Sequence, residues 1–219
     1  MLEVLEKASM RLFLTSAGMR MKHEIETFAS ELGKPVRCLY VTTASNPELD
    51  QTYVIRDRSV MENLGWEVEE IDLAGMSDEA IESALVRCNV VYVQGGNTFY
   101  LMKWIRESGF DRALRPWLER GGLYIGVSAG SIVVGTNMSV AGIAGGDANM
   151  VELKDLRGMG MVDLVISPHY EPLYEMEIAG YEREHGVEVT RLTDDQAVLV
   201  KDDRVEVVTT ENPFPKCSS

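Results

Sequence analysis

A serine between small residues marks the point where an apolar, strand-like run ends in the sequence GVSAG. Gly126 and Gly130 stand two positions to either side of Ser128, which is the G-x-S-x-G spacing of a nucleophile turn between a strand and a helix. The apex of such a turn has an uncommon backbone conformation, and bulky neighbours two positions away would clash. The N–H of Ala129 would face the serine and could stabilise an oxyanion. A glycine-rich loop that only binds an anion explains the pattern equally well. The nucleophile interpretation therefore requires a base close to Ser128.

A histidine after a second apolar run could activate this serine, because imidazole accepts a hydroxyl proton near neutral pH. His169 follows the run LVIS, which places it at the same sheet edge as Ser128. His23 lies within a helical pattern and His185 at a helix end, and both have ordinary structural explanations. His169 is therefore the candidate base. The interval from Ser128 to His169 is too short for an ordinary α/β-hydrolase, which inserts several βα units there.

An acidic residue should fix the imidazole ring, and the chain offers several. Asp147, in GGDAN, is the first choice because it lies in the loop between the serine and the histidine. The alternatives are Glu152, Asp155, Asp163, Glu171 and Asp194. A solvated loop charge is the ordinary explanation for any one of them, so the spacing leaves the choice open.

A second glycine turn follows the run VVYVQ. Gly95 and Gly96 end this run, and Asn97 or Thr98 supplies a helix N-cap. Backbone N–H groups in the turn could complete an oxyanion hole, although a purely structural role explains the glycines equally well. The spacing is neither G-x-G-x-x-G nor a phosphate loop. We therefore expect no cofactor, and no metal-site spacing is visible.

These residues must be positioned by strands that alternate with helices. Strand-like runs occupy residues 11–14, 36–42, 68–73, 90–94, 123–127 and 164–167, and helical patterns occupy residues 20–32, 51–64 and 97–108. Near-continuous apolar strands joined by helices predict an α/β fold with a doubly wound, mostly parallel sheet and helices on both faces. Residues 197–209 predict a hairpin at one edge. Ligands of such sheets bind beyond the carboxyl ends of the strands.

Length and charge limit the class of protein. The 219 residues, 45% of them hydrophobic, predict a single domain over residues 1–219. The net charge of −14 disfavours nucleic acid and anionic membranes as partners. No apolar run reaches the roughly 18 residues of a spanning helix, and no signal-peptide pattern begins the chain. Three cysteines at unrelated spacings, Cys38, Cys88 and Cys217, indicate a reducing, cytoplasmic location.

Three motifs in this order, QGGNTF, YIGVSAGS and ISPHY, resemble the dipeptidase E (aspartyl dipeptidase) family of serine peptidases, with cyanophycinases as more distant relatives. The resemblance runs from about Arg11 to Val208. It implies a fold like that of class I glutamine amidotransferases. It also implies an enzyme that removes N-terminal aspartate from short peptides without a metal or organic cofactor.

Residue by residue, the resemblance implies a catalytic set of Ser128 as nucleophile, His169 as base, Asp147 as the acidic member, and the amides of Gly96 and Ala129 as oxyanion donors. It implies two substrate-binding residues as well. Arg183 resembles the arginine that holds the substrate aspartate, and a guanidinium suits a carboxylate, but an ordinary pair with a neighbouring glutamate explains it equally well. Asp194 stands where the family often has a glutamate, and either receives the substrate amine or belongs to a turn.

The sequence thus predicts a cytoplasmic serine exopeptidase that cleaves short peptides with an N-terminal aspartyl residue through an acyl-enzyme. One alternative is a cyanophycinase-like hydrolase of β-aspartyl-arginine polymer, which the small size of the chain disfavours. The other is a non-catalytic, amidotransferase-like binding or sensor protein that holds acidic molecules at Arg183. The choice between α- and β-aspartyl substrates stays open, as does the oligomeric state, a homo-oligomer included.

Overall fold

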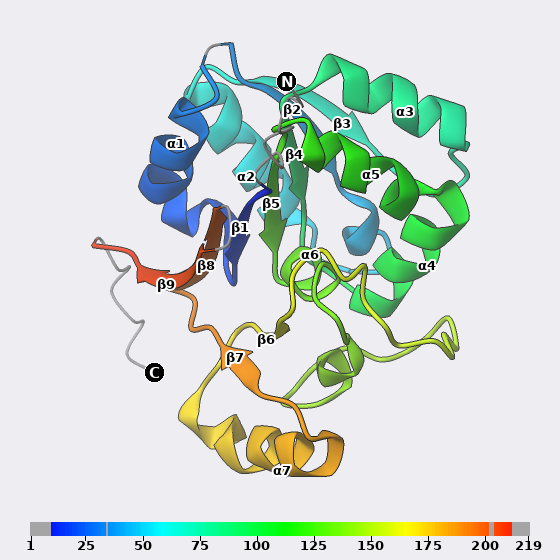
Figure 1. Ribbon diagram of the computed structural model, residues 1–219, viewed down its shortest axis with the longest axis vertical. Helices are drawn as coiled ribbons and strands as arrows, with labels where there is room; N and C mark the ends of the chain where they lie inside the picture. Colours follow the sequence, from blue (N-terminus) through cyan, green and yellow to red (C-terminus); the bar gives the residue numbers. More distant parts are fainter. Residues whose placement is uncertain (1–9, 34, 202–203, 212–219) are drawn as a thin grey trace, which may run out of the picture.

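A seven-stranded sheet forms the centre of the molecule. The computed structural model describes residues 10–33, 35–201 and 204–211, and in this part the strands follow the order β3-β2-β4-β5-β1-β8-β9 (Figure 1). Five neighbouring strands are parallel: β1 (Arg11–Thr15), β2 (Arg37–Val41), β3 (Glu67–Ile71), β4 (Val90–Val93) and β5 (Leu123–Val127). The predicted α/β fold with a mostly parallel sheet is confirmed.

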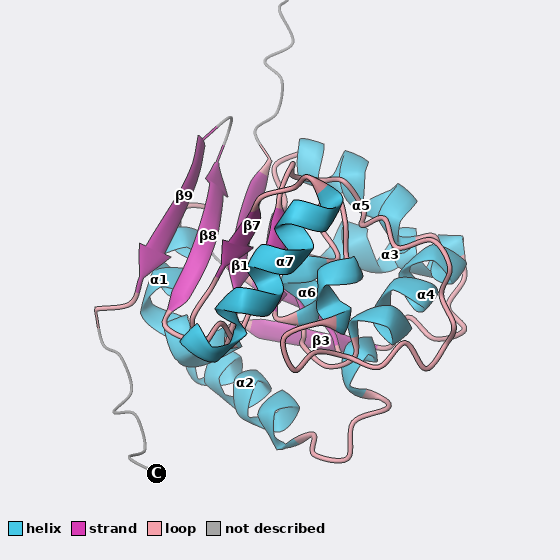
Figure 2. Cartoon of the chain, turned by 90° about the horizontal axis from the view of Figure 1, so that it is seen from below, coloured by secondary structure: helices cyan, strands magenta, loops and turns pink. Residues whose placement is uncertain are grey.

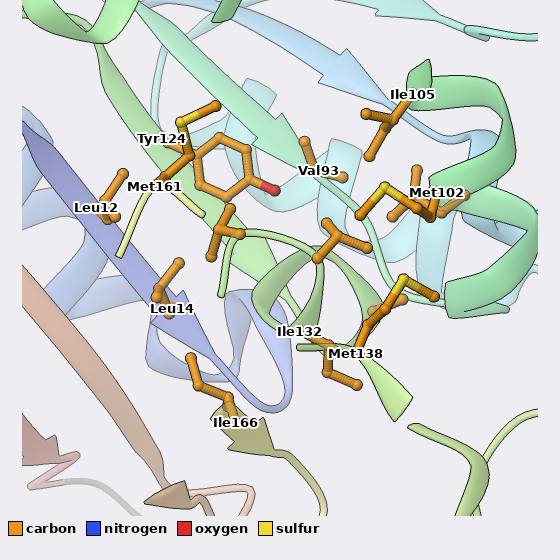
Figure 3. Packing of buried hydrophobic residues seen from close by; sticks show 14 of the residues in the cluster. Leu12, Leu14, Val93, Met102, Ile105, Tyr124, Ile132, Met138, Met161 and Ile166 are labelled. Carbon is orange, nitrogen blue, oxygen red and sulfur yellow. The ribbon is translucent and has the colours of Figure 1, made fainter. Parts of the chain in front are cut away.

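Helices cover both faces of this sheet, because successive side chains of a strand point to opposite faces. Phe13 packs in the cluster beneath α1 and α2, whereas Leu12 and Leu14 belong to the cluster covered by α3, α4 and α5 (Figures 2 and 3). The helices are α1 (Lys22–Ser30), α2 (Thr52–Asn63), α3 (Asp78–Arg87), α4 (Thr98–Ser108), α5 (Phe110–Glu119), α6 (Ala129–Ile132) and α7 (Glu175–His185). The helices predicted at residues 20–32, 51–64 and 97–108 correspond to α1, α2 and α4.

The last two strands of the sheet reverse its direction. Strand β8 (Gln196–Lys201) is antiparallel to β1, and β9 (Arg204–Thr209) is antiparallel to β8 at the edge. The predicted edge hairpin is confirmed, although residues 202–203 of its turn lie outside the described residues. Because of the reversal, the amino end of β8 lies at the carboxyl edge of the parallel strands, where Thr15 pairs with Ala197.

Residues 164–167 do form a strand, but the prediction that they extend the main sheet is wrong. Strand β6 (Val165–Ser167) pairs in parallel with β7 (Val189–Arg191) in a separate two-stranded sheet. The position beside β1 that a further parallel strand would take is already filled by β8. Strand β6 therefore lies beyond the carboxyl edge, next to β7 and α7 (Figure 1).

Two smaller expectations concern the cysteines and membranes. Cys38 is buried and Cys88 half-buried, and both are free thiols, while Cys217 lies outside the described residues. In the residues that the structure covers, we find no helix with the length and apolar character needed to cross a bilayer.

Close backbone approach explains the glycines of GVSAG. A Cβ on Gly126 would lie 2.6 Å from the carbonyl oxygen of Gly130. A Cβ on Gly130 would overlap the carbonyl oxygen of Val93 at the end of β4. Strand β5 and helix α6 therefore pack at backbone contact against each other and against β4, which only glycine permits.

Substitution of Gly130 tests this packing. In a helix, alanine is normally more stable than glycine by about 1 kcal/mol. We nevertheless expect Gly130→Ala to lower the free energy of unfolding by about 1–3 kcal/mol, because the methyl group meets rigid backbone. Urea denaturation measures the change. Gly142→Ala is the control, since its Cβ would lie 3.7 Å from the Phe99 ring, and a comparable loss in the control would contradict the explanation.

Candidate active site

Ser128 stands at a sharp turn between β5 and α6. Its backbone angles are φ 49° and ψ −110°, an uncommon conformation for a residue with a side chain. The turn is held by the N–H of Ser128, which donates to the carbonyl oxygen of Thr15 over 2.9 Å. The structure thus has the strand-to-helix turn that GVSAG predicts, with the serine at its apex.

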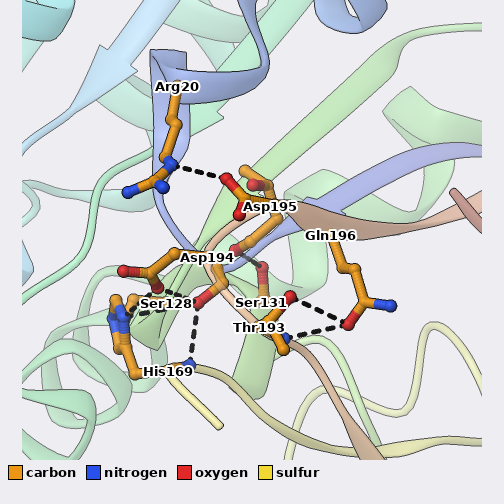
Figure 4. A network of polar contacts seen from close by, with 10 residues as sticks. Arg20, Ser128, Ser131, His169, Thr193, Asp194, Asp195 and Gln196 are labelled. Atoms are coloured by element: carbon orange, nitrogen blue, oxygen red, sulfur yellow. Dashed lines mark hydrogen bonds and ion pairs between the residues drawn. The ribbon is translucent and has the colours of Figure 1, made fainter. Parts of the chain in front are cut away.

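His169 brings its imidazole to this serine. Its Nε2 lies 3.0 Å from the Oγ of Ser128 (Figure 4). His169 follows β6 and also has a positive φ, 54°. Its backbone N–H donates to the hydroxyl of Ser16 over 2.8 Å, which fixes the ring's starting point at the end of β1. The two residues predicted as nucleophile and base are therefore within hydrogen-bonding distance.

Asp194 holds the other side of the imidazole. Its Oδ1 lies 2.7 Å from the Nδ1 of His169 and accepts a second hydrogen bond from the hydroxyl of Ser16 over 2.9 Å. The contact with His169 is the main cause that lowers the pKa of Asp194, against the opposing effect of burial. A charged Asp194 favours the tautomer with its proton on Nδ1, which leaves Nε2 free to accept the proton of Ser128.

Asp147, expected at this position, lies elsewhere in the site. Its Oδ2 accepts a hydrogen bond of 2.7 Å from the N–H of Thr98, the first residue of α4. Burial raises the pKa of Asp147, and the bond from Thr98 opposes the rise. The structure thus brings Asp194, and not Asp147, to the Nδ1 of His169.

The other acidic alternatives do not approach the imidazole in this way. Asp155 forms an ion pair of 2.6 Å with Arg157. Glu152, Asp163 and Glu171 are exposed.

The turn at Gly95 and Gly96 lies beside the serine. A Cβ on Gly95 would be only 3.1 Å from the Cβ of Ser128. The N–H of Gly95 donates to the Oε1 of Gln94, the residue that follows β4, over 2.8 Å. This hydrogen bond fixes the turn. Gly96 has a φ of 133°, open to glycine alone. Within the described part of the chain, the N–H groups of Gly96 and Ala129 donate to no other residue, so both are available to a ligand.

A pocket of about 360 Å³ opens next to Ser128 and His169. Three acidic residues, Glu48, Asp57 and Asp147, line it together with Arg56. Tyr53 lines it as well, and burial raises the pKa of this phenol to about 12, so its hydroxyl stays protonated. The size suits a short peptide, and the excess of carboxylates favours a positively charged group.

Arg183 is not brought to this pocket. It lies on α7 with its residue exposed to solvent, and the described residues that line the pocket do not include it. Its charge contributes to lowering the pKa of Glu182, although the main cause there is the hydrogen bond from Arg191. Arg183 thus lies at the surface of α7, outside the pocket.

Sequence reasoning missed Ser16, and it named Asp194 only as one of several alternatives for the acidic residue that contacts His169. Both had a signal in the sequence. Ser16 lies two positions after the predicted strand at residues 11–14, and Asp194 lies three positions before the predicted hairpin, which begins at residue 197. An antiparallel edge strand begins at the edge where parallel strands end, so the pair could have been placed together had the strand order been known.

The comparison with known proteins gives the family. The sequence pattern of Peptidase family S51 matches residues 12–208. An uncharacterized peptidase of Listeria innocua, Lin0382, is 30% identical over 200 residues, which are 89% of this chain and 94% of that protein. A Peptidase E of Nostoc sp. is 31% identical over 150 residues, 68% of this chain and 57% of that protein. The crystal structure of a candidate Peptidase E protein from Listeria monocytogenes EGD-e aligns with a TM-score of 0.80 and 26% identity over 93% of this chain and 100% of that chain.

The chain therefore belongs to Peptidase family S51, a family of serine peptidases, and is a peptidase. The resemblance to the dipeptidase E family that the three motifs indicated is confirmed at the level of the family. Among the described residues, no group of three or more histidine, cysteine, aspartate or glutamate side chains is placed to hold a metal ion.

The lowered pKa of Asp194 predicts how the stability of the protein depends on pH. Because the unfolded chain protonates this carboxyl at higher pH than the folded chain, its contribution is complete above the unfolded pKa of about 3.9 and is lost as the pH falls through the lower folded pKa. We expect the difference in unfolding free energy between wild type and Asp194→Asn to be constant near neutral pH and to shrink below about pH 4. Urea denaturation at several pH values measures it, with Asp163→Asn as control. A difference in unfolding free energy that stays constant well below pH 4 would contradict the lowered pKa of Asp194.

Proposed function

We propose that the protein is a serine exopeptidase in which Ser128, His169 and Asp194 form the catalytic triad. The observation that carries this proposal is the continuous chain of contacts from Asp194 to Nδ1 at 2.7 Å and from Nε2 to the Ser128 hydroxyl at 3.0 Å. A hydroxyl is a weak nucleophile until a base takes its proton, and the base must be held in one tautomer. The two distances support both conditions.

The reaction follows from these positions. The Oγ of Ser128 attacks the carbonyl carbon of the first peptide bond, and its proton moves to Nε2 of His169 while Asp194 stabilises the imidazolium. The oxyanion lies against the N–H groups of Gly96 and Ala129. Collapse of the intermediate breaks the C–N bond, and His169 gives its proton to the leaving amine. Water then attacks the acyl-enzyme with His169 as base, which releases the acid and restores Ser128.

The pocket supports cleavage next to the N-terminus of a short peptide. A free α-amine carries a positive charge, and the carboxylates of Glu48 and Asp147 line the same pocket as Ser128. Asp147 takes one hydrogen bond through Oδ2, which leaves lone pairs on Oδ1 for an ammonium group. In this proposal Asp147 binds the substrate amine. The preference for an aspartyl residue rests on the resemblance to dipeptidase E.

The first test is hydrolysis of a panel of dipeptides. We expect the purified protein to release the N-terminal residue, fastest from Asp-X, and Ser128→Ala to lose at least ~10³-fold in kcat/KM, because no acyl-enzyme can form. Quantification of the released amino acid measures the rate. Ser131→Ala serves as the control of a neighbouring buried hydroxyl, which bonds to the carbonyl oxygens of Thr15 and Gly126. Equal rates for wild type and Ser128→Ala would rule out the mechanism.

The second test separates the two acidic residues. Asp194→Asn is expected to lower kcat by ~10³–10⁴-fold, since an amide at this position favours the wrong imidazole tautomer. Asp147→Asn is expected mainly to raise KM for substrates with a free amine, because it removes a charge that binds the amine and leaves the imidazole in place. Steady-state kinetics distinguish the two. The opposite pattern, with kcat lost only in Asp147→Asn, would return Asp147 to the triad.

A further inference from the structure

A substrate carboxylate needs a cation within the pocket, and the structure offers one that has no place in the proposed triad. Of the described residues that line the pocket, Arg56 and His169 are basic, and His169 faces Ser128. The residue expected to bind a carboxylate from the resemblance, Arg183, lies on the exposed side of α7. Arg56 comes from α2, which also brings Tyr53 and Asp57 to the pocket.

The guanidinium of Arg56 is held in place while most of its donors stay free. Its Nε and Nη2 both donate to Oδ1 of Asp57, over 3.2 and 3.1 Å. The side chain is 64% exposed, whereas that of Asp57 is 1% exposed. A guanidinium has five N–H donors, and within the described chain no further contact of this group is recorded. The remaining donors, Nη1 included, can form the paired hydrogen bonds that a carboxylate accepts.

Asp57, which holds the guanidinium of Arg56, is itself held by buried polar groups. Arg56 is therefore positioned before a substrate binds. Oδ2 of Asp57 accepts hydrogen bonds from the hydroxyl of Tyr92 over 2.9 Å and from Nε2 of Gln94 over 3.0 Å. The Oε1 of Gln94 in turn accepts from the N–H of Gly95, next to the expected oxyanion donor. A carboxylate on Arg56 is thus tied through buried polar groups to the turn at which the reacting carbonyl would lie.

The charges of the residues that line the pocket favour Arg56 as the group that binds a carboxylate. Glu48 and Asp147 repel a carboxylate and attract an amine, whereas Arg56 does the reverse. Asp57 compensates part of the guanidinium charge, but both of its oxygens are already occupied by protein groups. A short peptide carries an amine and at least one carboxylate. Attraction of the amine to Glu48 and Asp147 and of the carboxylate to Arg56 would therefore fix the direction in which the peptide binds.

We infer that Arg56 is the specificity-determining residue of this site and binds a carboxylate of the substrate. The carboxylate comes either from an acidic N-terminal side chain or from the C-terminus of a dipeptide, two sources with the same chemistry. This inference rests on the proposed function, because it places the peptide in the pocket next to Ser128.

Four substrates separate the two sources: Asp-Leu, Asp-Leu-amide, Asn-Leu and Asn-Leu-amide. Arg56→Met is expected to lower kcat/KM by roughly 10- to 100-fold for the substrates that carry the recognised carboxylate and to leave Asn-Leu-amide unchanged, since charged hydrogen bonds of this kind are lost only there. A loss with Asp-Leu-amide assigns the side chain, and a loss with Asn-Leu assigns the C-terminus. Arg183→Met is the matched control and should change none of the four.

Two outcomes overturn the inference: no loss with any substrate, or an equal loss with all four, which would show a structural role for Arg56. Because Arg56→Met leaves the buried Asp57 without its cation, Arg56→Lys and the double variant Arg56→Met, Asp57→Asn are compared in the same assay. If Arg56→Met does not fold, these two variants decide. Arg56→Lys should retain part of the preference for carboxylates, and the double variant should lose it.

Binding is measured separately, so that failure of this inference and failure of the proposed function differ. Calorimetry with Asp-Leu compares Ser128→Ala with the Ser128→Ala, Arg56→Met variant, and we expect Kd to rise roughly tenfold or more in the latter. Turnover by wild type with an unchanged substrate ratio in Arg56→Met overturns the inference alone. Binding that depends on Arg56 without turnover by wild type contradicts the peptidase mechanism alone. Absence of both turnover and binding contradicts both.

Discussion

The end of β1 fixes both Ser128 and His169 through two consecutive positions, Thr15 and Ser16. The carbonyl oxygen of Thr15 accepts from the N–H of Ser128 over 2.9 Å, and the hydroxyl of Ser16 accepts from the N–H of His169 over 2.8 Å. Ser128 and His169 both have positive φ angles, 49° and 54°. Such conformations cost about 1–3 kcal/mol each and persist only where neighbouring groups hold them. One strand end therefore supports the two strained residues on which the site depends.

The reversal of strand direction at β1 and β8 brings Asp194 to His169. Because β8 is antiparallel, the chain enters it from the carboxyl edge, and Asp194 precedes that entry. The Ser16 hydroxyl accepts from the N–H of His169 and donates to Asp194 over 2.9 Å, so a single oxygen joins His169 and Asp194. Next to this group, Nε of Arg20 donates to Asp195 over 2.8 Å and fastens the same turn to the segment that follows β1. Four distant stretches of sequence meet at the end of one strand.

The sequence was most informative where local pattern decides the outcome. The spacing of Gly126 and Gly130 predicted the turn at Ser128 because the clash that a Cβ on Gly126 would make with Gly130 lies within the motif itself. The strand runs predicted the sheet because burial on both faces leaves a continuous apolar signal. A strand end before His169 was visible for the same reason. These features needed no knowledge of which strands lie side by side.

The remaining features depend on spatial order. The run at residues 164–167 is apolar enough for any sheet, and only the occupation of the position beside β1 by β8 sends it to β7. Asp147 and Asp194 are equally plain loop carboxylates in the sequence, and the direction of β8 decides between them at Nδ1 of His169. Which arginine lines the pocket depends on where its helix lies in the fold: Arg56 on α2 lines the pocket, and Arg183 on α7 does not.

Helix α2 contributes both to the core and to the pocket. Val54 and Met61 are buried in the core, whereas Tyr53 and Arg56, three positions apart, line the pocket. Asp57 is buried, lines the pocket as well and accepts hydrogen bonds from Arg56. The buried side carries the fold, and the open side carries contacts to whatever occupies the pocket. If Arg56 binds the substrate as proposed, exchange of Tyr53 and Arg56 would change which peptides bind and would leave Ser128, His169 and Asp194 in place. A change of substrate preference, in evolution or in the laboratory, would then need substitutions on only one face of α2.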